Sequence, residues 1–404
     1  MPRIIFLTTL TLWSMGKGHG GPAFTQTIKK YIDEGWEVFL ISDEPSNKDY
    51  PYLDATHNLV LKPTLFKKYC QIRKLGLIFR WLDHVRMTRT FYREAAHLLA
   101  DHSKNTVLYA YEIFGVETCR RLAQTFSVPF VTRFQGTILS QFPNTLANRI
   151  KRYPHFQALA QLADLVIMTD DGSKGEQVLQ ALGNTSTTMF LRNGLDLMAH
   201  DIPAKKRDFP RDAFRSALGL TEEETMFLTV SRLVKWKKVE RSIDGFAAFC
   251  KKGLPGKLVI VGDGENRSVL EQRAKELGIA DKVVFTGSVA HDQVYDYMMA
   301  CDVFLSLYDL SNVGNPLLEA MTLGKCIITL DVGDTKSLIH HRENGILLTK
   351  ETLSALSDMM IELAETPALR DMLGTAAAAD AQVNFQTWEA RMDTEFRAVS
   401  AILH

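Results

Sequence analysis

The sequence predicts an α/β fold with two doubly wound, Rossmann-like domains, and three observations lead to this prediction. Short apolar runs alternate with longer helical patterns, the series pauses once near residue 200, and a second series then begins. The length of 404 residues agrees with this, because domains commonly contain about 100–200 residues. Strand–helix–strand alternation implies parallel sheets that are covered by helices on both faces.

Ten segments are expected to form strands, because short apolar runs bounded by turn residues are typical of buried parallel strands. They are residues 4–10, 37–42, 106–110, 130–134 and 165–169, then 226–231, 257–261, 282–286, 303–307 and 326–329. Helical patterns separate most of them, for example at residues 24–35 and 267–277.

The pause at residues 200–210 contains Pro203, Pro210 and a run of charges, which is typical of a linker. We therefore expect an N-terminal domain at residues 1–200 and a C-terminal domain at residues 201–380. Residues 381–404, with Trp388, are expected to form a C-terminal helix that packs back on the body.

Composition excludes several classes of protein. The 47 basic and 47 acidic residues give zero net charge, which argues against general nucleic-acid binding. The five cysteines are scattered, so they indicate a reducing compartment and predict neither a disulfide framework nor a zinc site. No uncharged apolar run reaches the ~18 residues of a membrane span, and residues 4–13 resemble a first strand more than a signal peptide. We expect a cytoplasmic protein.

A glycine loop follows the first expected strand. Gly16, Gly18 and Gly21 have the spacing of a dinucleotide-binding loop, and Asp43 stands at the end of the next strand. Glycines also let a backbone approach a sugar phosphate, or simply form a turn. An NAD or FAD site, a substrate loop and a structural turn therefore all remain open.

Two cations follow the first strand of the second domain. Arg232 leaves the end of this strand and Lys237 lies five residues further on. Ligands of open α/β sheets bind outside the carboxyl ends of strands, and this pair of cations suits a diphosphate. A solvated basic loop is the alternative.

A third candidate, residues 309–321, follows the strand at 303–307. Pro316 is expected near the start of a helix, so the amides of residues 314–317 would offer an anion site at the helix N-terminus. Glu319, one turn further on, could accept hydrogen bonds from a ribose. The alternative is that Glu319 only complements the helix dipole.

Nine sequence pieces, taken in order, resemble the retaining family-4 glycosyltransferases of the GT-B fold. They are GGP at 20–22, ADLVI at 163–167, RNGLD at 192–196, SRL at 231–233 with Lys237, VGDG at 261–264, FTG at 285–287, CDVFLS at 301–306, PLLEAM at 316–321 and ENG at 343–345. The resemblance implies two Rossmann-like domains that face each other across a cleft. It also implies that the C-terminal domain binds a nucleotide sugar, expected to be UDP-linked, and that the N-terminal domain binds the acceptor.

The resemblance further implies residue roles. Arg232 and Lys237 would stabilise the departing diphosphate, and Glu319 would bind the ribose. The sugar and phosphates would contact the other expected donor-binding residues, which are Gly20, Gly21, Gly262, Gly264, Ser311, Gly314 and Asn315.

Two departures from the family pattern matter. The acid expected eight residues before Glu319 is replaced by Ser311, so Asp309 is the candidate for its catalytic role. A histidine of the N-terminal domain is replaced by Gln135, which we assign with Arg133 to acceptor binding.

The expected activity is sugar transfer to a saccharide acceptor, either free or lipid-linked, with retention of the anomeric configuration. Front-face displacement suits the loss of a histidine base, and no D-x-D pattern suggests a metal. We expect no cofactor, no metal and no nucleic acid. The alternatives are an NAD-dependent oxidoreductase that uses the Gly16–Gly21 loop, a nucleotide-sugar epimerase of the same fold, and a non-catalytic binder.

Residues 62–93 carry nine basic side chains against one acid, Asp83, with apolar side chains interleaved. Such a basic apolar helix suits the anionic surface of a membrane. The alternative is an ordinary helix with a solvated basic face. A peripheral position at the inner face of a membrane, with a lipid-linked acceptor, is therefore one expectation.

Overall fold

A computed structural model describes residues 1–9, 23–42, 52, 54–61, 65–66, 69–70, 75–196, 208–310 and 313–403. The chain divides into two compact units. Unit 1 comprises Met1–Asp170, Lys174–Arg192 and Trp388–His404, and unit 2 comprises Asp171–Ser173 and Asn193–Thr387. The boundary expected at residues 200 and 201 lies outside the described residues.

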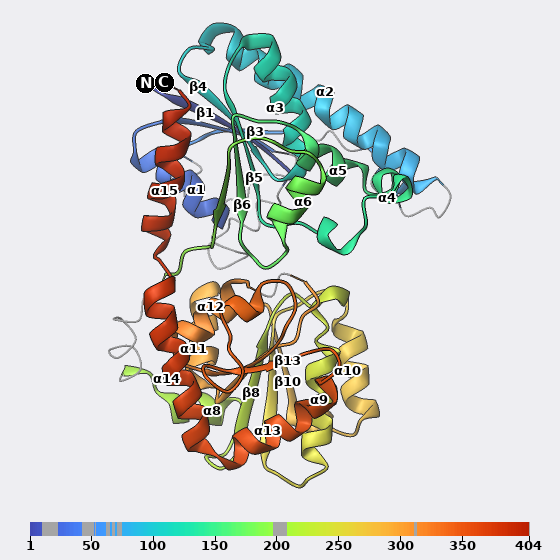
Figure 1. The fold of residues 1–404 in the computed structure, drawn as a ribbon, viewed down its shortest axis with the longest axis vertical. Coiled ribbons are helices and arrows are strands. Elements are labelled where there is room, and N and C mark those ends of the chain that lie inside the picture. Colours follow the sequence, from blue (N-terminus) through green and yellow to red (C-terminus); the bar gives the residue numbers. More distant parts are fainter. Residues whose placement is uncertain are drawn as a thin grey trace. The chain divides into compact units, whose positions relative to one another are not determined.

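Unit 1 contains a parallel sheet in the order β3-β2-β1-β4-β5-β6-β7 (Figure 1). Its strands are β1 (Arg3–Thr8), β2 (Glu37–Ser42), β3 (His57–Val60), β4 (Thr106–Tyr111), β5 (Phe130–Phe134), β6 (Leu165–Thr169) and β7 (Thr188–Leu191). Its helices are α1 (Ala23–Asp33), α2 (Gly76–His102), α3 (Ile113–Phe126), α4 (Leu146–Lys151), α5 (Tyr153–Ala160), α6 (Gly175–Ala181) and α15 (Trp388–Ala401).

Unit 2 contains a second parallel sheet in the order β10-β9-β8-β11-β12-β13. Its strands are β8 (Thr225–Val230), β9 (Gly256–Val261), β10 (Val283–Gly287), β11 (Val303–Ser306), β12 (Cys326–Leu330) and β13 (Ile346–Leu348). Its helices are α8 (Arg211–Ala217), α9 (Glu240–Cys250), α10 (Arg267–Glu276), α11 (His291–Ala300), α12 (Asn315–Thr322), α13 (Leu356–Glu365) and α14 (Pro367–Asn384). The two parallel sheets with flanking helices confirm the expected fold class.

The expected C-terminal helix is α15, and it packs on α1 of unit 1. Lys30 of α1 pairs with Asp393 of α15 at 2.6 Å. Deeper in the unit, Glu395 accepts a hydrogen bond of 2.5 Å from the hydroxyl of Tyr109. A polar contact therefore fixes the end of the chain to the middle of the first sheet.

The described helices include none that is both long and apolar enough to cross a membrane. All five cysteines are free thiols.

Candidate functional site

The sheet of unit 2 has a topological switch point between β8 and β11. The chain leaves β8 toward β9 on one side, and it leaves β11 toward β12 on the other. The connections that follow β8 and β11 therefore run in opposite directions and leave a crevice outside the carboxyl ends of the two strands. Ligands of open α/β sheets bind in such a crevice. The segments after β8 and β11 contain the cations and the acid that the sequence singled out.

Arg232 and Lys237 follow β8, and a single-turn helix at Lys235–Lys237 brings them to the same aromatic ring. The guanidinium carbon of Arg232 lies 5.7 Å from the centre of the Trp236 ring, and Nζ of Lys237 lies 4.6 Å from it. Nζ of Lys237 is also 4.3 Å from the ring centre of Tyr308, which follows β11. The structure thus places both predicted cations at the switch point.

Hydrogen bonds join the two segments. The Asp309 amide donates to the Trp236 carbonyl at 3.1 Å, and the hydroxyl of Tyr308 donates to the Val230 carbonyl at 2.9 Å. These bonds fix the aromatic rings that surround Lys237. Neither Trp236 nor Tyr308 was a predicted site residue, although an aromatic residue between two cations is a signal for cation–π contacts.

Lys237 is partly buried. Burial lowers the pKa of its ammonium, the charge of Asp171 opposes this effect, and the charge of Arg232 adds to it, so that the pKa is about 7. Lysine readily shows such shifts, because its compact charge is strongly hydrated in water. The amine is consequently close to half-protonated at neutral pH and would gain its full charge beside an anion.

Helix α12 begins at Asn315, one residue before Pro316. The Leu317 amide donates to the Gly314 carbonyl at 3.0 Å, so it is engaged within the turn itself. The side chain of Asn315 accepts a hydrogen bond of 2.8 Å from that of Asn193. Of the predicted helix-terminal amides, those of Gly314 and Asn315 are therefore the candidates to bind an anion.

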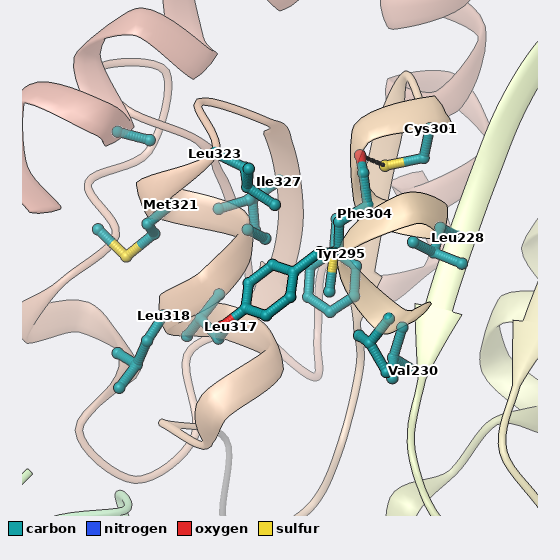
Figure 2. Packing of buried hydrophobic residues seen from close by; sticks show 14 of the residues in the cluster. Leu228, Val230, Tyr295, Cys301, Phe304, Leu317, Leu318, Met321, Leu323 and Ile327 are labelled. Atoms are coloured by element: carbon teal, nitrogen blue, oxygen red, sulfur yellow. Dashed lines mark hydrogen bonds between the residues drawn. The ribbon is translucent and has the colours of Figure 1, made fainter. Parts of the chain in front are cut away.

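The apolar face of α12 anchors the helix in the core of unit 2. Figure 2 shows Leu317, Leu318 and Met321 among the buried apolar side chains of one cluster, which also includes Phe304 of β11. Glu319 lies on the same helix and is only 2% exposed. A buried carboxylate needs partners, because an unpaired charge in the interior is costly.

His291, at the first position of α11, is that partner. Its Nε2 lies 3.0 Å from Oε1 of Glu319, and its Nδ1 lies 3.5 Å from Oδ2 of Asp196. Burial by itself lowers the pKa of His291, but the hydrogen bond and charge of Glu319, with Asp196 and Asp292, outweigh burial and raise it above 6.5. Sequence reasoning missed His291, because its acidic partners lie far away along the chain.

Asp309 has a partner within the fold. Its carboxylate accepts a hydrogen bond of 2.7 Å from Arg241, whose other terminal nitrogen donates to the Leu307 carbonyl at 2.8 Å. The structure therefore gives Asp309 a part in holding the segment after β11. Ser311, the alternative to Asp309, lies outside the described residues.

Gly262 and Gly264 approach the backbone of residues 231–233. A Cβ atom at Gly262, where φ is +130°, would lie 1.9 Å from the Ser231 carbonyl oxygen, and one at Gly264 would lie 2.5 Å from that of Leu233. The Leu233 amide donates to the Asp263 carbonyl at 2.9 Å. These two glycines, predicted to contact a donor, thus allow the loops after β8 and β9 to interlock.

In unit 1, the two residues predicted to bind the acceptor differ in their exposure to solvent. Gln135 is exposed beyond β5, where its backbone amide donates to Glu112 at 2.7 Å and its side-chain amide hydrogen bonds to the Tyr111 hydroxyl. Arg133 is fully buried, with a hydrogen bond to Thr27 and an ion pair of 3.5 Å with Glu395. This corrects the expectation for Arg133, because a side chain without exposed surface cannot touch an acceptor.

Four predicted features lie outside the described residues: Gly20 and Gly21, the Gly16–Gly21 loop as a whole, and Asp43. Among the residues that the structure does describe, no group of three or more His, Cys, Asp or Glu side chains could hold a metal ion.

Comparison with known proteins adds an independent observation. Residues 210–380, nearly all of unit 2, match the family "Glycosyl transferases group 1". N-acetyl-alpha-D-glucosaminyl L-malate synthase from Bacillus anthracis is 29% identical over 45% of this chain and 46% of its own length. Alpha-monoglucosyldiacylglycerol synthase from Streptococcus pneumoniae is 31% identical over 38% of this chain and 35% of its own. The chain thus matches less than half the length of either relative.

Solved structures resemble the chain over its whole length. The structure of Alr3699/HepE from Anabaena, in complex with UDP and glucose, has a TM-score of 0.71 over 99% of this chain and 100% of that chain, at 19% identity. This likeness confirms the GT-B fold. The family match relates the chain to glycosyl transferases group 1 and favours the transferase expectation over the oxidoreductase alternative.

Proposed function

We propose that this protein is a glycosyltransferase that takes a sugar from a nucleotide-sugar donor. The observation that carries the proposal is that Arg232 and Lys237 follow β8 and that Glu319 lies in α12, which follows β11, so that all three come after the two strands beside the switch point of the unit 2 sheet. Two cations suit a diphosphate, and a carboxylate suits a ribose diol. The match of residues 210–380 to glycosyl transferases group 1 supports the same conclusion.

In this proposal, transfer proceeds with retention at the anomeric carbon. The bond between the anomeric carbon and the diphosphate oxygen breaks as the acceptor oxygen bonds to the same face of the sugar. The acceptor's proton passes to the departing phosphate oxygen. Such a step depends chiefly on stabilising negative charge on the leaving group, which is the role we give Arg232 and Lys237.

The first turn of α12 would complete the donor site. The amides of Gly314 and Asn315 point from a helix N-terminus, where the helix dipole favours an anion. Glu319 would accept hydrogen bonds from the ribose, and its contact with His291 would orient the carboxylate. Asp309 would act by fixing the loop through Arg241 and not by contacting the sugar. Gly262 and Gly264 would likewise shape the donor site through loop packing.

The acceptor is proposed to be a saccharide, held in unit 1 near Gln135. Gln135 is exposed at the carboxyl edge of the unit 1 sheet, the edge at which α/β proteins bind ligands. A lipid-linked acceptor, met at the cytoplasmic side of a membrane, would suit the likeness to the relative named alpha-monoglucosyldiacylglycerol synthase.

Thermal unfolding in the presence of UDP, GDP, ADP, NAD and several UDP-sugars tests the donor proposal. A ligand at a hundredfold excess over its Kd stabilises the native state by about 2.7 kcal/mol. We expect UDP and a UDP-sugar to raise the Tm of the wild type and to lose this effect in Arg232→Ala. If GDP raises the Tm and UDP does not, the proposed nucleotide is wrong but the proposed binding site stands.

Lys252→Ala is the matched control, because it removes a cation from the exposed turn that precedes β9, at the opposite edge of the same sheet. It should keep the nucleotide-induced shift. A shift with NAD alone that persists in Arg232→Ala would overturn the proposal and favour an oxidoreductase.

A further inference from the structure

One face of unit 1 exposes apolar side chains from three helices, and we call it the α2–α4 face. It comprises Leu77, Ile78 and Trp81 at the start of α2, Leu146 and Ile150 of α4, and Tyr153 of α5. Trp81 is 51% exposed, Ile150 58% and Leu146 75%. Isolated apolar side chains are normal on a surface, but a contiguous group of large ones marks an interaction site.

All members of this face except Leu146 line a common groove. A hollow of about 930 Å³ is lined by Leu77, Ile78 and Trp81 on one side and by Ile150 and Tyr153 on the other. Phe114 and Ile138 also line it. Figure 1 shows the start of α2 beside α4. The exposed residues thus form one continuous surface.

The pattern of α2 explains why these side chains are exposed. Further along the helix, Met87, Phe91, Ala95 and Leu99 recur every four residues and are buried in the unit 1 core. The first turn carries Leu77, Ile78 and Trp81 before this stripe begins. Its apolar side chains therefore lack the core contacts that the rest of the helix has.

The charges around the face are of one sign. Arg80 and Lys151 are exposed beside the groove and Arg152 lines it, while the sequence has no acid at residues 136–163. Asp83, the acid of this part of α2, is buried, and its carboxylate accepts hydrogen bonds from the amides of Leu65 and Phe66. A partner of this face must therefore be both apolar and anionic.

We propose that the α2–α4 face docks unit 1 on the surface of a lipid bilayer that contains anionic lipids. Trp81, Ile78 and Ile150 enter the boundary between headgroups and acyl chains, and Arg80, Lys151 and Arg152 contact the lipid phosphates. A second copy of the chain is a poorer occupant, because a symmetric contact would bring the two cationic faces together. The inference does not depend on the proposed transferase activity.

Flotation with vesicles tests the docking proposal. The full-length protein should float with vesicles of mixed phosphatidylglycerol and phosphatidylcholine, and should float roughly a hundredfold less with phosphatidylcholine alone, because each of the three basic side chains near an anionic surface adds about 1 kcal/mol. High salt should reduce the binding. The triple variant Ile78→Ser/Trp81→Ser/Ile150→Ser and the double variant Arg80→Glu/Lys151→Glu should each lose about tenfold or more in partitioning.

Matched controls separate the face from general properties of the chain. Val269→Ser/Met372→Ser/Val383→Ser removes exposed apolar side chains from unit 2, and Lys251→Glu/Lys252→Glu makes the same charge change there. Both controls should bind vesicles within about twofold of the wild type. Equal loss in the controls and in the face variants would overturn the proposal, and so would a wild type that does not float.

Two further measurements keep the outcomes distinct. Without lipid, the wild type and the face variants should sediment at the same oligomeric state. If the wild type self-associates and the face variants do not, the face is instead a contact between two copies of the chain. The UDP-induced rise in Tm should persist in the face variants. Its absence in the wild type would count against the donor proposal while leaving the vesicle result intact.

Discussion

The Nε2 atom of His291 lies 3.0 Å from Oε1 of Glu319, so the buried carboxylate of α12 is paired with an imidazole whose pKa is raised above its usual value. Asp196 and Asp292 add negative charge around the imidazole, and the ring of Tyr295 lies 5.6 Å from it, edge on. The acid proposed to bind ribose is therefore held by a charge that depends on pH.

We predict a pH-dependent stability from this pair. The pKa of His291 is raised in the folded state, so its contribution is complete below the unfolded value of about 6.5 and is lost as the pH rises through the folded pKa. The difference in Tm between the wild type and His291→Gln should therefore shrink as the pH increases from 6 to 9. His97→Gln, at an exposed position of α2, is the control and should show no such trend. A constant Tm difference for His291→Gln would contradict the pairing.

Lys237 leads to a second prediction, for nucleotide binding. Its pKa is about 7 in the free protein, and a bound diphosphate favours the charged amine, so binding above that pH must take up a proton. Affinity for UDP should fall by up to about tenfold per pH unit between about pH 7 and 9, a range in which the phosphate itself is fully ionised. Calorimetric titration measures this. The Lys237→Met variant should bind weakly with a flat pH profile, and a steep profile in that variant would assign the proton to another group.

A third prediction concerns the interlocked loops. Gly262→Ala should destabilise the protein by about 2–4 kcal/mol, because the new Cβ would collide with the Ser231 carbonyl. Urea unfolding measures the change. Gly253→Ala is the matched control: it also has a positive φ, +80°, but no atom lies within 4 Å of its Cβ position, so it should cost only about 1 kcal/mol. Equal losses would mean that backbone strain, and not loop contact, explains the glycine.

The fourth prediction tests the buried polar group of unit 1. Glu395 is fully buried against Arg133 and Arg391; burial alone would raise its pKa, but the two guanidinium charges hold it below its usual value. Glu395→Gln should cost about 3–5 kcal/mol in urea unfolding, because two buried cations lose their counter-charge. The control is Asp393→Asn, on the same helix as Glu395. It removes a surface partner of Lys30 and should change the stability little. A small loss in Glu395→Gln would show that the guanidinium groups are compensated otherwise.

The sequence predicted the interior strands of each sheet well, but of the four edge strands it predicted only β10 (expected at 282–286). The runs at 37–42, 130–134 and 165–169 match β2, β5 and β6, since strands buried on both faces give continuous apolar runs. The strands β3, β7 and β13 were not predicted. All three lie at sheet edges and contain only three or four residues, so their apolar runs are too short to stand out in the sequence.

The candidate site was predictable where it depends on local sequence. Arg232, Lys237 and Glu319 follow strands in short motifs, so their place at one sheet edge follows from the fold. His291 could not be found in this way, because its role depends on Glu319 and Asp196, which come from other elements. Arg133 shows the converse: its place beside Gln135, near the end of a strand, suggested a ligand contact, whereas Glu395 of the C-terminal helix pairs with it in the interior of unit 1.

The central claim is that the switch point of unit 2 binds a nucleoside diphosphate through Lys237 and Arg232. The most direct measurement is the affinity for UDP, together with the Tm, of Lys237→Met beside Lys252→Met. Loss of a charge-assisted contact should weaken UDP binding by roughly tenfold to a hundredfold. The Tm of each unliganded variant checks that it still folds. Unchanged UDP affinity in Lys237→Met, or an equal loss in Lys252→Met, would contradict the account.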